Sequence, residues 1–228
     1  MKDGDISIND IKVFSSIKEL LSEYSDADSV IIDIPIGLPE SKEDLRPDSE
    51  LRKRLKGKAS SVFTTPCRQA VYANDYEKAS KINREEMGIG LSKQSFETCK
   101  KIKEVDEFLH SSPYWQEKLK ESHPEYGFAV LNNDNPVLES KTSYFGAVAR
   151  ISILKRYLFN INELIEDISR NTVLKNRLDD VLDAICLAVV GDFGVNTEFH
   201  SIPEKPEKDK KGLLMQIVYA EVNKCLVR

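Results

Sequence analysis

The chain has 228 residues, of which 40% are hydrophobic and 31% charged, a composition typical of a globular protein with one substantial core. No apolar run approaches the roughly 20 residues that cross a bilayer, and the first residues lack a signal-peptide pattern, so we expect a cytoplasmic protein without a membrane partner. The net charge of −5 argues against a surface coated for nucleic acid, and the four scattered cysteines predict reduced thiols rather than a zinc site.

The first part of the chain combines strand-like and helix-like patterns. Residues 5–14 alternate between apolar and polar and predict one kinked strand or two short paired strands. A helix is expected over residues 15–24. The β-branched run VIIDIPI at residues 30–36 is apolar on both faces, as in a central strand that helices cover on both sides.

A long segment without strand patterns follows this run. Helical patterns recur there at residues 43–56, 74–87 and 92–110. Because structureless connections longer than about 15 residues are uncommon, we predict a helical insertion at residues 40–117 that packs beside the sheet.

The second half of the chain is predicted to be mostly helical. A short strand ending near Ser122 passes into a helix that starts at Pro124, the favoured first-turn position for proline. Further helices are expected at residues 141–158, 161–169 and 178–191. The last of these should end near Gly191 or Gly194, before a final strand at residues 213–220.

One carboxylate, that of Asp33, interrupts the apolar run SVIIDIPIGL at residues 29–38. Burying an unpaired charge costs several kcal/mol, so this aspartate needs a physical reason. It either caps the turn before Pro35 and Pro39, or it is a metal ligand or acid/base group. The second reading suits the carboxyl end of a strand, where open α/β sheets place their sites.

Two more groups of acidic residues stand where elements meet. Asp180 and Asp183 share a face of the expected helix, and Asp183 leads directly into an apolar run that must be buried. Glu121 and Glu125 flank the passage from strand to helix. With Asp33 they supply the oxygen ligands that Mg²⁺ or Mn²⁺ prefers in a two-metal hydrolytic site. The alternative for Asp180 and Asp183 is an acidic first turn that complements the helix dipole.

A basic strip lies at residues 52–68, which contain no acidic residue. Its charges are those of Arg52, Lys53, Arg54, Lys56, Lys58 and Arg68. Such a strip on an acidic protein can follow a phosphate backbone, and Phe63 within it can stack on a base. Lys141, before an expected helix, can reach a phosphate in the same cleft. The alternative for the strip is a solvated helix end that runs into a structural loop.

Six segments, in order, resemble an uncharacterised family of predicted nucleases with an RNase H-like fold. They are IDIPIGLPE, SSVFTTPCR, GIGLSKQ, KIKEVD, HPEYGFAVLN and DDVLDA, and the similarity covers nearly the whole chain. The resemblance implies an α/β fold with a mixed sheet flanked by helices. It also implies that Asp33 is the acid of the fourth strand and that Asp180 and Asp183 are the acids of a late helix, with roles near the fifth strand for Glu121 or Glu125.

The resemblance also implies that one acid is missing. Family members begin with a strand that carries an aspartate, and this sequence has no match for it, since Asp3, Asp5 and Asp10 have turn-like surroundings. Either the sequence is a truncated reading or the metal site lacks one acid, so we expect weak or absent nuclease activity. The strand at residues 29–36 should keep an open edge, which pairs either with residues 5–10 or with another copy of the chain.

These features predict a single RNase H-like domain of residues 1–228 that hydrolyses phosphodiester bonds of DNA or RNA with Mg²⁺ or Mn²⁺. Two alternatives stay open. One is a catalytically incomplete module that binds nucleic acid or protein. The other is a hydrolase or transferase of a small phosphorylated ligand, which the isoelectric point of about 5.4 suits better than a long duplex.

Overall fold

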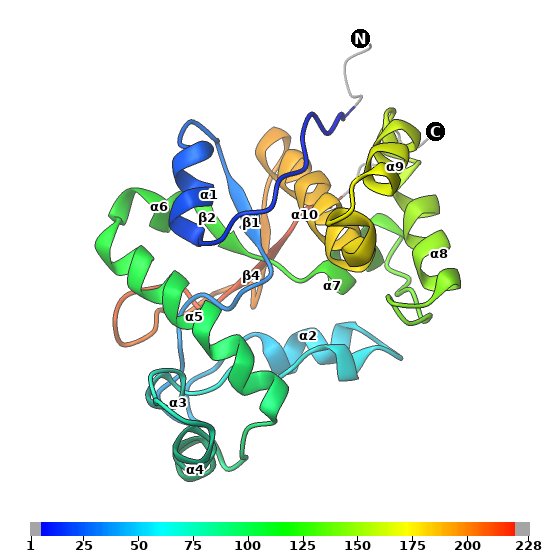
Figure 1. Cartoon of the computed structure of the whole chain (residues 1–228). Coiled ribbons are helices and arrows are strands. Elements are labelled where there is room, and N and C mark those ends of the chain that lie inside the picture. Colours follow the sequence, from blue (N-terminus) through cyan, green and yellow to red (C-terminus); the bar gives the residue numbers. More distant parts are fainter. Residues whose placement is uncertain (1–5, 222–228) are drawn as a thin grey trace.

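Two short parallel strands lie at the centre of the computed structural model, which describes residues 6–221 (Figure 1). β1 (Val30–Ile32) pairs with β2 (Leu119–Glu121). Val30 and Ile32 pack into a core with α1 (Ile17–Glu23) and α5 (Lys93–Ser111), whereas Ile31 lies against Gly191 of α10 (Leu178–Asn196). The β-branched run is thus covered by helices on both sides, and the expected α/β class is confirmed.

A second pair of strands lies beside the first. β3 (His200–Ile202) and β4 (Ile217–Tyr219) are antiparallel. Ser122, directly after β2, donates a hydrogen bond of 2.7 Å from its hydroxyl to the carbonyl oxygen of Val218 in β4. β4 is shorter than the predicted strand at residues 213–220, because residues 209–213 form a turn whose backbone N–H groups bond to the Asp209 carboxylate.

The chain between β1 and β2 is helical. It contains α2 (Asp48–Arg54), the 3₁₀ turn η1 (Ala59–Ser61), α3 (Arg68–Val71), α4 (Tyr76–Met87), α5 and α6 (Pro113–Lys118). α4 and α5 begin after Asp75 and Ser92, whose side chains accept backbone N–H bonds from the first turn. The sequence predicts the first helix from residue 43, but it begins at Asp48 because Pro47 disfavours helical geometry in Arg46.

Helices of the second half surround a common core (Figure 1). They are α7 (Pro124–Leu131), α8 (Tyr144–Leu154), α9 (Ile161–Arg170), the 3₁₀ turn η2 (Leu174–Arg177) and α10. α10 does not stop at Gly191 or Gly194. A Cβ atom at Gly191 would lie 3.0 Å from Ile31, and one at Gly194 would overlap the ring of Phe199. The two glycines therefore permit close packing instead of ending the helix. Within residues 6–221, no helix is long and apolar enough to cross a membrane.

The N-terminal segment forms no regular strand in its described part, residues 6–14, contrary to the expected strand or hairpin. Ile6 makes a single parallel bridge with Leu158, and Ile6, Ile8 and Ile11 pack on the helical core instead of on β1. Helices offer no open row of backbone groups, so the segment stays irregular. Among the described residues no strand pairs with the second edge of β1, and hollows of about 360 and 600 Å³ follow this edge.

Arg68 fastens the helical segment to the rest of the molecule. Its buried guanidinium donates hydrogen bonds to three carboxylates from distant parts of the chain, those of Glu40, Asp106 and Asp209. The Tyr72 hydroxyl also donates to Asp106, at 2.7 Å. Each of the three guanidinium nitrogens is engaged inside the protein, which contradicts the prediction that Arg68 binds a phosphate.

Replacing Arg68 with Met should lower the free energy of unfolding by about 3–5 kcal/mol, because two buried carboxylates lose their counter-charge. Urea denaturation followed by circular dichroism measures this change. The control is Arg170→Met, which removes an exposed pair with Glu166 and should cost less than about 1 kcal/mol. Equal losses in the two variants would contradict the structural role of Arg68.

Candidate functional site

Asp33 directly follows β1, at the carboxyl end of the strand. Asp33 borders a small cavity of about 20 Å³ that is also lined by Phe63, Glu121 and His123. Asp33 keeps contact with solvent, but the protein packed around its carboxylate removes much of the water and so raises its pKa above the ordinary value. An aspartate in this position takes up a proton more readily than a free one.

Four other titratable side chains act on the Asp33 carboxylate. The charges of His123 and Lys141 lower its pKa, whereas those of Glu125 and Asp180 raise it. These groups come from α7 and the residue before it, from α10 and from the loop before α8. The carboxyl end of β1 is therefore where distant acidic and basic residues come within electrostatic reach of one another.

Asp183 of α10 belongs to the same group. Burial raises its pKa to about 6, an effect that Lys141 opposes and that the charges of Asp33 and Glu125 increase. The Lys141 Nζ donates to Asp183 Oδ2 at 2.8 Å. Burial alone would lower the pKa of Lys141, but the hydrogen bond and charge of Asp183 outweigh it, so this pKa is raised and the ammonium stays charged.

Glu125 lies in the first turn of α7, with its carboxylate held by two cations. Arg150, whose exposed fraction is 0%, donates from Nη2 to Glu125 Oε1 at 2.7 Å, and Lys58 Nζ lies 3.7 Å from the same oxygen. The Arg150 guanidinium also lies over the ring of Phe128, 5.3 Å from its centroid. This ion pair fixes the orientation of Glu125 from inside the protein.

Four buried polar atoms in this region have no hydrogen-bond partner. They are Asp183 Oδ1, Glu125 Oε2, His123 Nδ1 and Arg150 Nε. An unpaired buried polar atom costs about 1–3 kcal/mol, so several of them near one point are typical of a place that binds a ligand. Within residues 6–221, no three His, Cys, Asp or Glu side chains lie close enough to form a ready-made metal cluster.

Glu121 does not have a free carboxylate. Its Oε1 accepts from Arg46 Nη2 at 2.6 Å and its Oε2 accepts the backbone N–H of Ile36 at 2.7 Å. Both oxygens are thus used to join β2 to the turn after β1, which corrects the prediction that Glu121 takes part in catalysis. Asp180 is exposed on α10 and borders the hollow of about 360 Å³.

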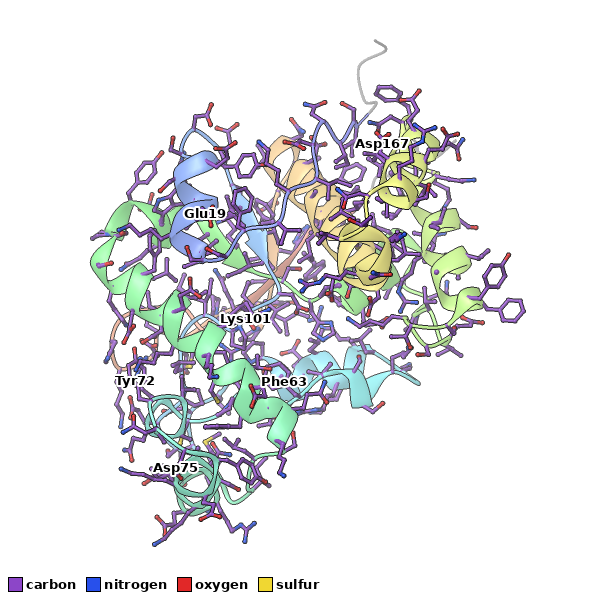
Figure 2. All side chains as sticks on the ribbon, in the orientation of Figure 1. Glu19, Phe63, Tyr72, Asp75, Lys101 and Asp167 are labelled. Atoms are coloured by element: carbon purple, nitrogen blue, oxygen red, sulfur yellow. The ribbon has the colours of Figure 1, made fainter. Side chains whose placement is uncertain are left out.

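The basic strip divides into two groups. Arg52 donates to the Val62 carbonyl and the Thr64 hydroxyl, and Arg54 donates to Glu50 and to the hydroxyls of two tyrosines, so their guanidinium groups are engaged inside the fold. Lys53 and Lys56 are exposed, whereas the Lys58 ammonium lies 3.7 Å from the carboxylate of Glu125, one of the acids of the site. Phe63 is partly exposed beside α2 (Figure 2).

Within residues 6–14, the described part of the N-terminal segment, no further acid joins the site. Asp10 is exposed and pairs with Lys12 at 2.9 Å. Asp3 and Asp5 lie outside the described residues.

A family model described as "Protein of unknown function (DUF429)" matches residues 1–208. The chain belongs to the DUF429 family. No curated protein and no solved structure shows a significant match. The matched region of this DUF429 chain includes Asp33, Glu125 and Asp183, together with Lys141 and Arg150.

Two residues of the site were not predicted from the sequence of this DUF429 chain. His123 precedes α7 and resembles an ordinary turn residue in the sequence, so only its position beside Asp33 gives it a role. Arg150 stands in the apolar helical run YFGAVARISIL, at a position that faces inward. An arginine on the apolar face of a helix needs a buried acid, and this signal could have indicated a partner such as Glu125.

Burial of Asp183 predicts a distinct pH dependence of stability. Because its pKa is about 6 in the folded state and near 4 in the unfolded state, the folded protein binds this proton more tightly. The contribution of this proton to the free energy of unfolding is fully present below pH 4 and is lost as the pH rises through 6. Asp183→Asn removes this loss, so the stability of the variant relative to the original should rise by about 2 kcal/mol between pH 4 and pH 7.

Chemical denaturation at a series of pH values measures this difference. The control is Asp192→Asn, which changes an exposed aspartate of the same helix and should give a difference that does not vary with pH. A flat profile for Asp183→Asn would show that Asp183 ionises normally in the folded protein.

Proposed function

We propose that this DUF429 chain is a divalent-metal-dependent phosphodiesterase that acts on nucleic acid, with an RNase H-like arrangement of its strands and acids. The observation that carries the proposal is the meeting of Asp33, Asp183 and Glu125 beside the carboxyl ends of β1 and β2, with unpaired oxygens on the last two. An open α/β sheet places ligands at this end of its strands. A set of carboxylates there suits the chemistry of phosphate esters.

The residues fit a hydrated Mg²⁺ or Mn²⁺ ion. Mg²⁺ is commonly held by one or two carboxylates together with water and substrate phosphate, so it does not need a complete protein cage. Asp33 and Asp183 would hold the ion, and the free Oδ1 of Asp183 supports this assignment. Bound there, the ion would supply a water of lowered pKa and stabilise charge on the phosphate.

The chain's own residues would divide the remaining tasks. Lys141 neutralises Asp183 in the absence of substrate, and its ammonium can turn to a phosphate oxygen when Asp183 is otherwise engaged. Arg150 holds Glu125 in place, so that its free Oε2 can orient a water or accept a proton. His123 Nδ1 is a second proton acceptor or donor beside Asp33.

Three lysines support nucleic acid as the substrate. Lys53 and Lys56, in and just after α2, are exposed. Lys58 follows them in the chain and pairs with Glu125, one of the carboxylates of the site. The exposed ammonium groups of Lys53 and Lys56 are available to contact phosphates. The engaged side chains of Arg52 and Arg54 are left out of this surface.

Hydrolysis of a labelled oligonucleotide tests the function. The original chain should cleave DNA or RNA slowly with Mg²⁺ or Mn²⁺, as expected from the unmatched first-strand acid, and not with excess EDTA. Asp33→Asn and Asp183→Asn should each lower the rate by a factor of about 100 or more, because each removes a carboxylate that holds the ion. Asp192→Asn is the matched control and should keep the original rate.

The outcomes separate the proposal from its alternatives. Binding of the oligonucleotide without metal-dependent cleavage would contradict hydrolysis and favour a catalytically incomplete binding module. Cleavage of small phosphate esters without any effect on oligonucleotides would instead favour an enzyme for small phosphorylated ligands. Unchanged cleavage in Asp183→Asn would remove α10 from the site.

We also propose that the open edge of β1 mediates pairing with a second copy of the chain. The hollow of about 600 Å³ along this edge is lined by Val30 and Ile31 on one side and by Ala184 and Ala188 of α10 on the other. An apolar strand edge with unpaired backbone groups favours association with another strand.

Solution mass measured by light scattering over a range of concentrations tests this pairing. The original chain should show a dimer or larger species. Ala188→Lys should give the monomer, because it places a charge in the hollow without disturbing the core. Ser152→Lys on the exposed face of α8 is the control and should leave the mass unchanged. A monomer at all concentrations in the original chain would contradict the proposal.

A further inference from the structure

Two aromatic rings project into solvent at the start of α8. Tyr144 is 77% exposed and Phe145 is 73% exposed, and their ring centroids are 5.5 Å apart in an edge-to-face arrangement. Leu138 and Val148 nearby are also exposed. Large apolar side chains that gather within eleven residues of sequence and stay outside the core are typical of a binding surface.

The rings stand on a well-ordered base. The Ser143 side chain accepts the backbone N–H of Gly146 at 3.0 Å and so caps α8 directly below the rings. Gly146 itself is tightly packed, because a Cβ atom there would overlap the carbonyl oxygen of Ser140. The first turn of α8 therefore holds the backbone of Tyr144 and Phe145 in place, so little backbone freedom is lost when a ligand binds.

The segment before the rings joins the carboxylate site to the lysines. Lys141, three residues before Tyr144, bonds to Asp183. Lys58 Nζ donates to the carbonyl oxygen of Glu139 at 3.0 Å, and the Leu138 side chain packs where a Cβ atom of Gly57 would lie. One short stretch of chain, residues 138–145, thus carries an aromatic pair, borders the basic strip and reaches the candidate catalytic acids.

We propose that Tyr144 and Phe145 stack unpaired bases, so that the substrate of the proposed nuclease is single-stranded nucleic acid or has a single-stranded arm. This inference rests on the proposed function for its catalytic meaning. Proteins commonly bind single strands with aromatic side chains close to cations, because bases stack on the rings while ammonium groups contact the phosphates. A duplex offers the phosphates but keeps the faces of its internal bases covered, so it cannot use the rings in this way.

The charge around the rings favours nucleic acid over an apolar protein partner. Lys56 is exposed, and Lys58 and Lys141, which pair with Glu125 and Asp183, lie on the segments that adjoin Tyr144 and Phe145. The phosphates of a strand can use these charges, whereas a partner that only filled an apolar patch would not. A strand that stacks on the rings and continues past Lys141 would bring its backbone to Asp183. This continuity ties the binding surface to the site.

Fluorescence anisotropy in EDTA tests the inference separately from cleavage. The ligands are labelled single strands of about 20 nucleotides and a duplex of the same length, at low salt. The original chain should bind the single strand more tightly. Tyr144→Ala and Phe145→Ala should each weaken that binding about fivefold or more, with a larger loss in the double variant and little change for the duplex. Both rings are exposed, so thermal denaturation should be unchanged.

Matched controls come from other exposed rings of the same residue types. Tyr114 is 59% exposed on α6 and Phe159 is 54% exposed after α8, so Tyr114→Ala and Phe159→Ala should alter single-strand binding by less than about twofold. The variant Tyr144→Trp should keep the affinity, and its new indole fluorescence should be quenched when the strand binds.

Several results would overturn the inference. Single-strand affinity that is unchanged in the double variant would show that the rings do not bind nucleic acid, and would favour a protein partner for them. Equal losses for duplex and single strand, or equal losses in the Tyr114 and Phe159 variants, would show that stacking on this pair is not the cause. An original chain that binds the single strand through the rings but cleaves nothing with metal would support the inference and contradict the proposed hydrolysis.

Discussion

The buried ion pair between Arg46 and Glu121 holds the centre of this molecule together. Arg46 donates to the carbonyl oxygens of Ile36 and Gly37 as well as to Glu121, and Glu121 accepts the N–H of Ile36 in return. The turn after β1 is thereby tied to the end of β2. Asp33 lies between the strand and that turn, so its position depends on these hydrogen bonds. A two-stranded pair only three residues long would otherwise hold the turn weakly.

Charge balance gives the candidate site its character. Each of its two most buried carboxylates already has a basic partner, Lys141 for Asp183 and Arg150 for Glu125. The two partners differ in one important way, since Arg150 is fully enclosed whereas Lys141 is partly exposed on a loop. One cation is therefore enclosed in the core, whereas the other is held by an ion pair with Asp183 and also faces solvent.

The sequence indicated that Asp33 and Asp183 need partners, but it did not indicate most of the packing around them. Asp33 was identifiable because a carboxylate in an apolar strand needs a reason, and Asp183 because it enters an apolar helix; both lie in the same electrostatic neighbourhood. Arg68 was misread because a sequence shows a charge and not its partners, and those partners lie 28, 38 and 141 residues away. Gly191 and Gly194 were misread for the same reason, since the residues that need their small size, Ile31 and Phe199, are not adjacent in the helical pattern.

The Arg68 network has a consequence for where this domain physically ends. The DUF429 match closes at residue 208, but Asp209, the next residue, accepts from both Arg68 and the backbone N–H of Leu38. A chain that ended at residue 208 would leave the buried Arg68 without Asp209, one of its three acidic partners. It would also lose β4, whose Val218 carbonyl accepts the hydrogen bond from the Ser122 hydroxyl. Sequence similarity therefore stops before the cooperative unit does, and the folded unit extends at least through Tyr219.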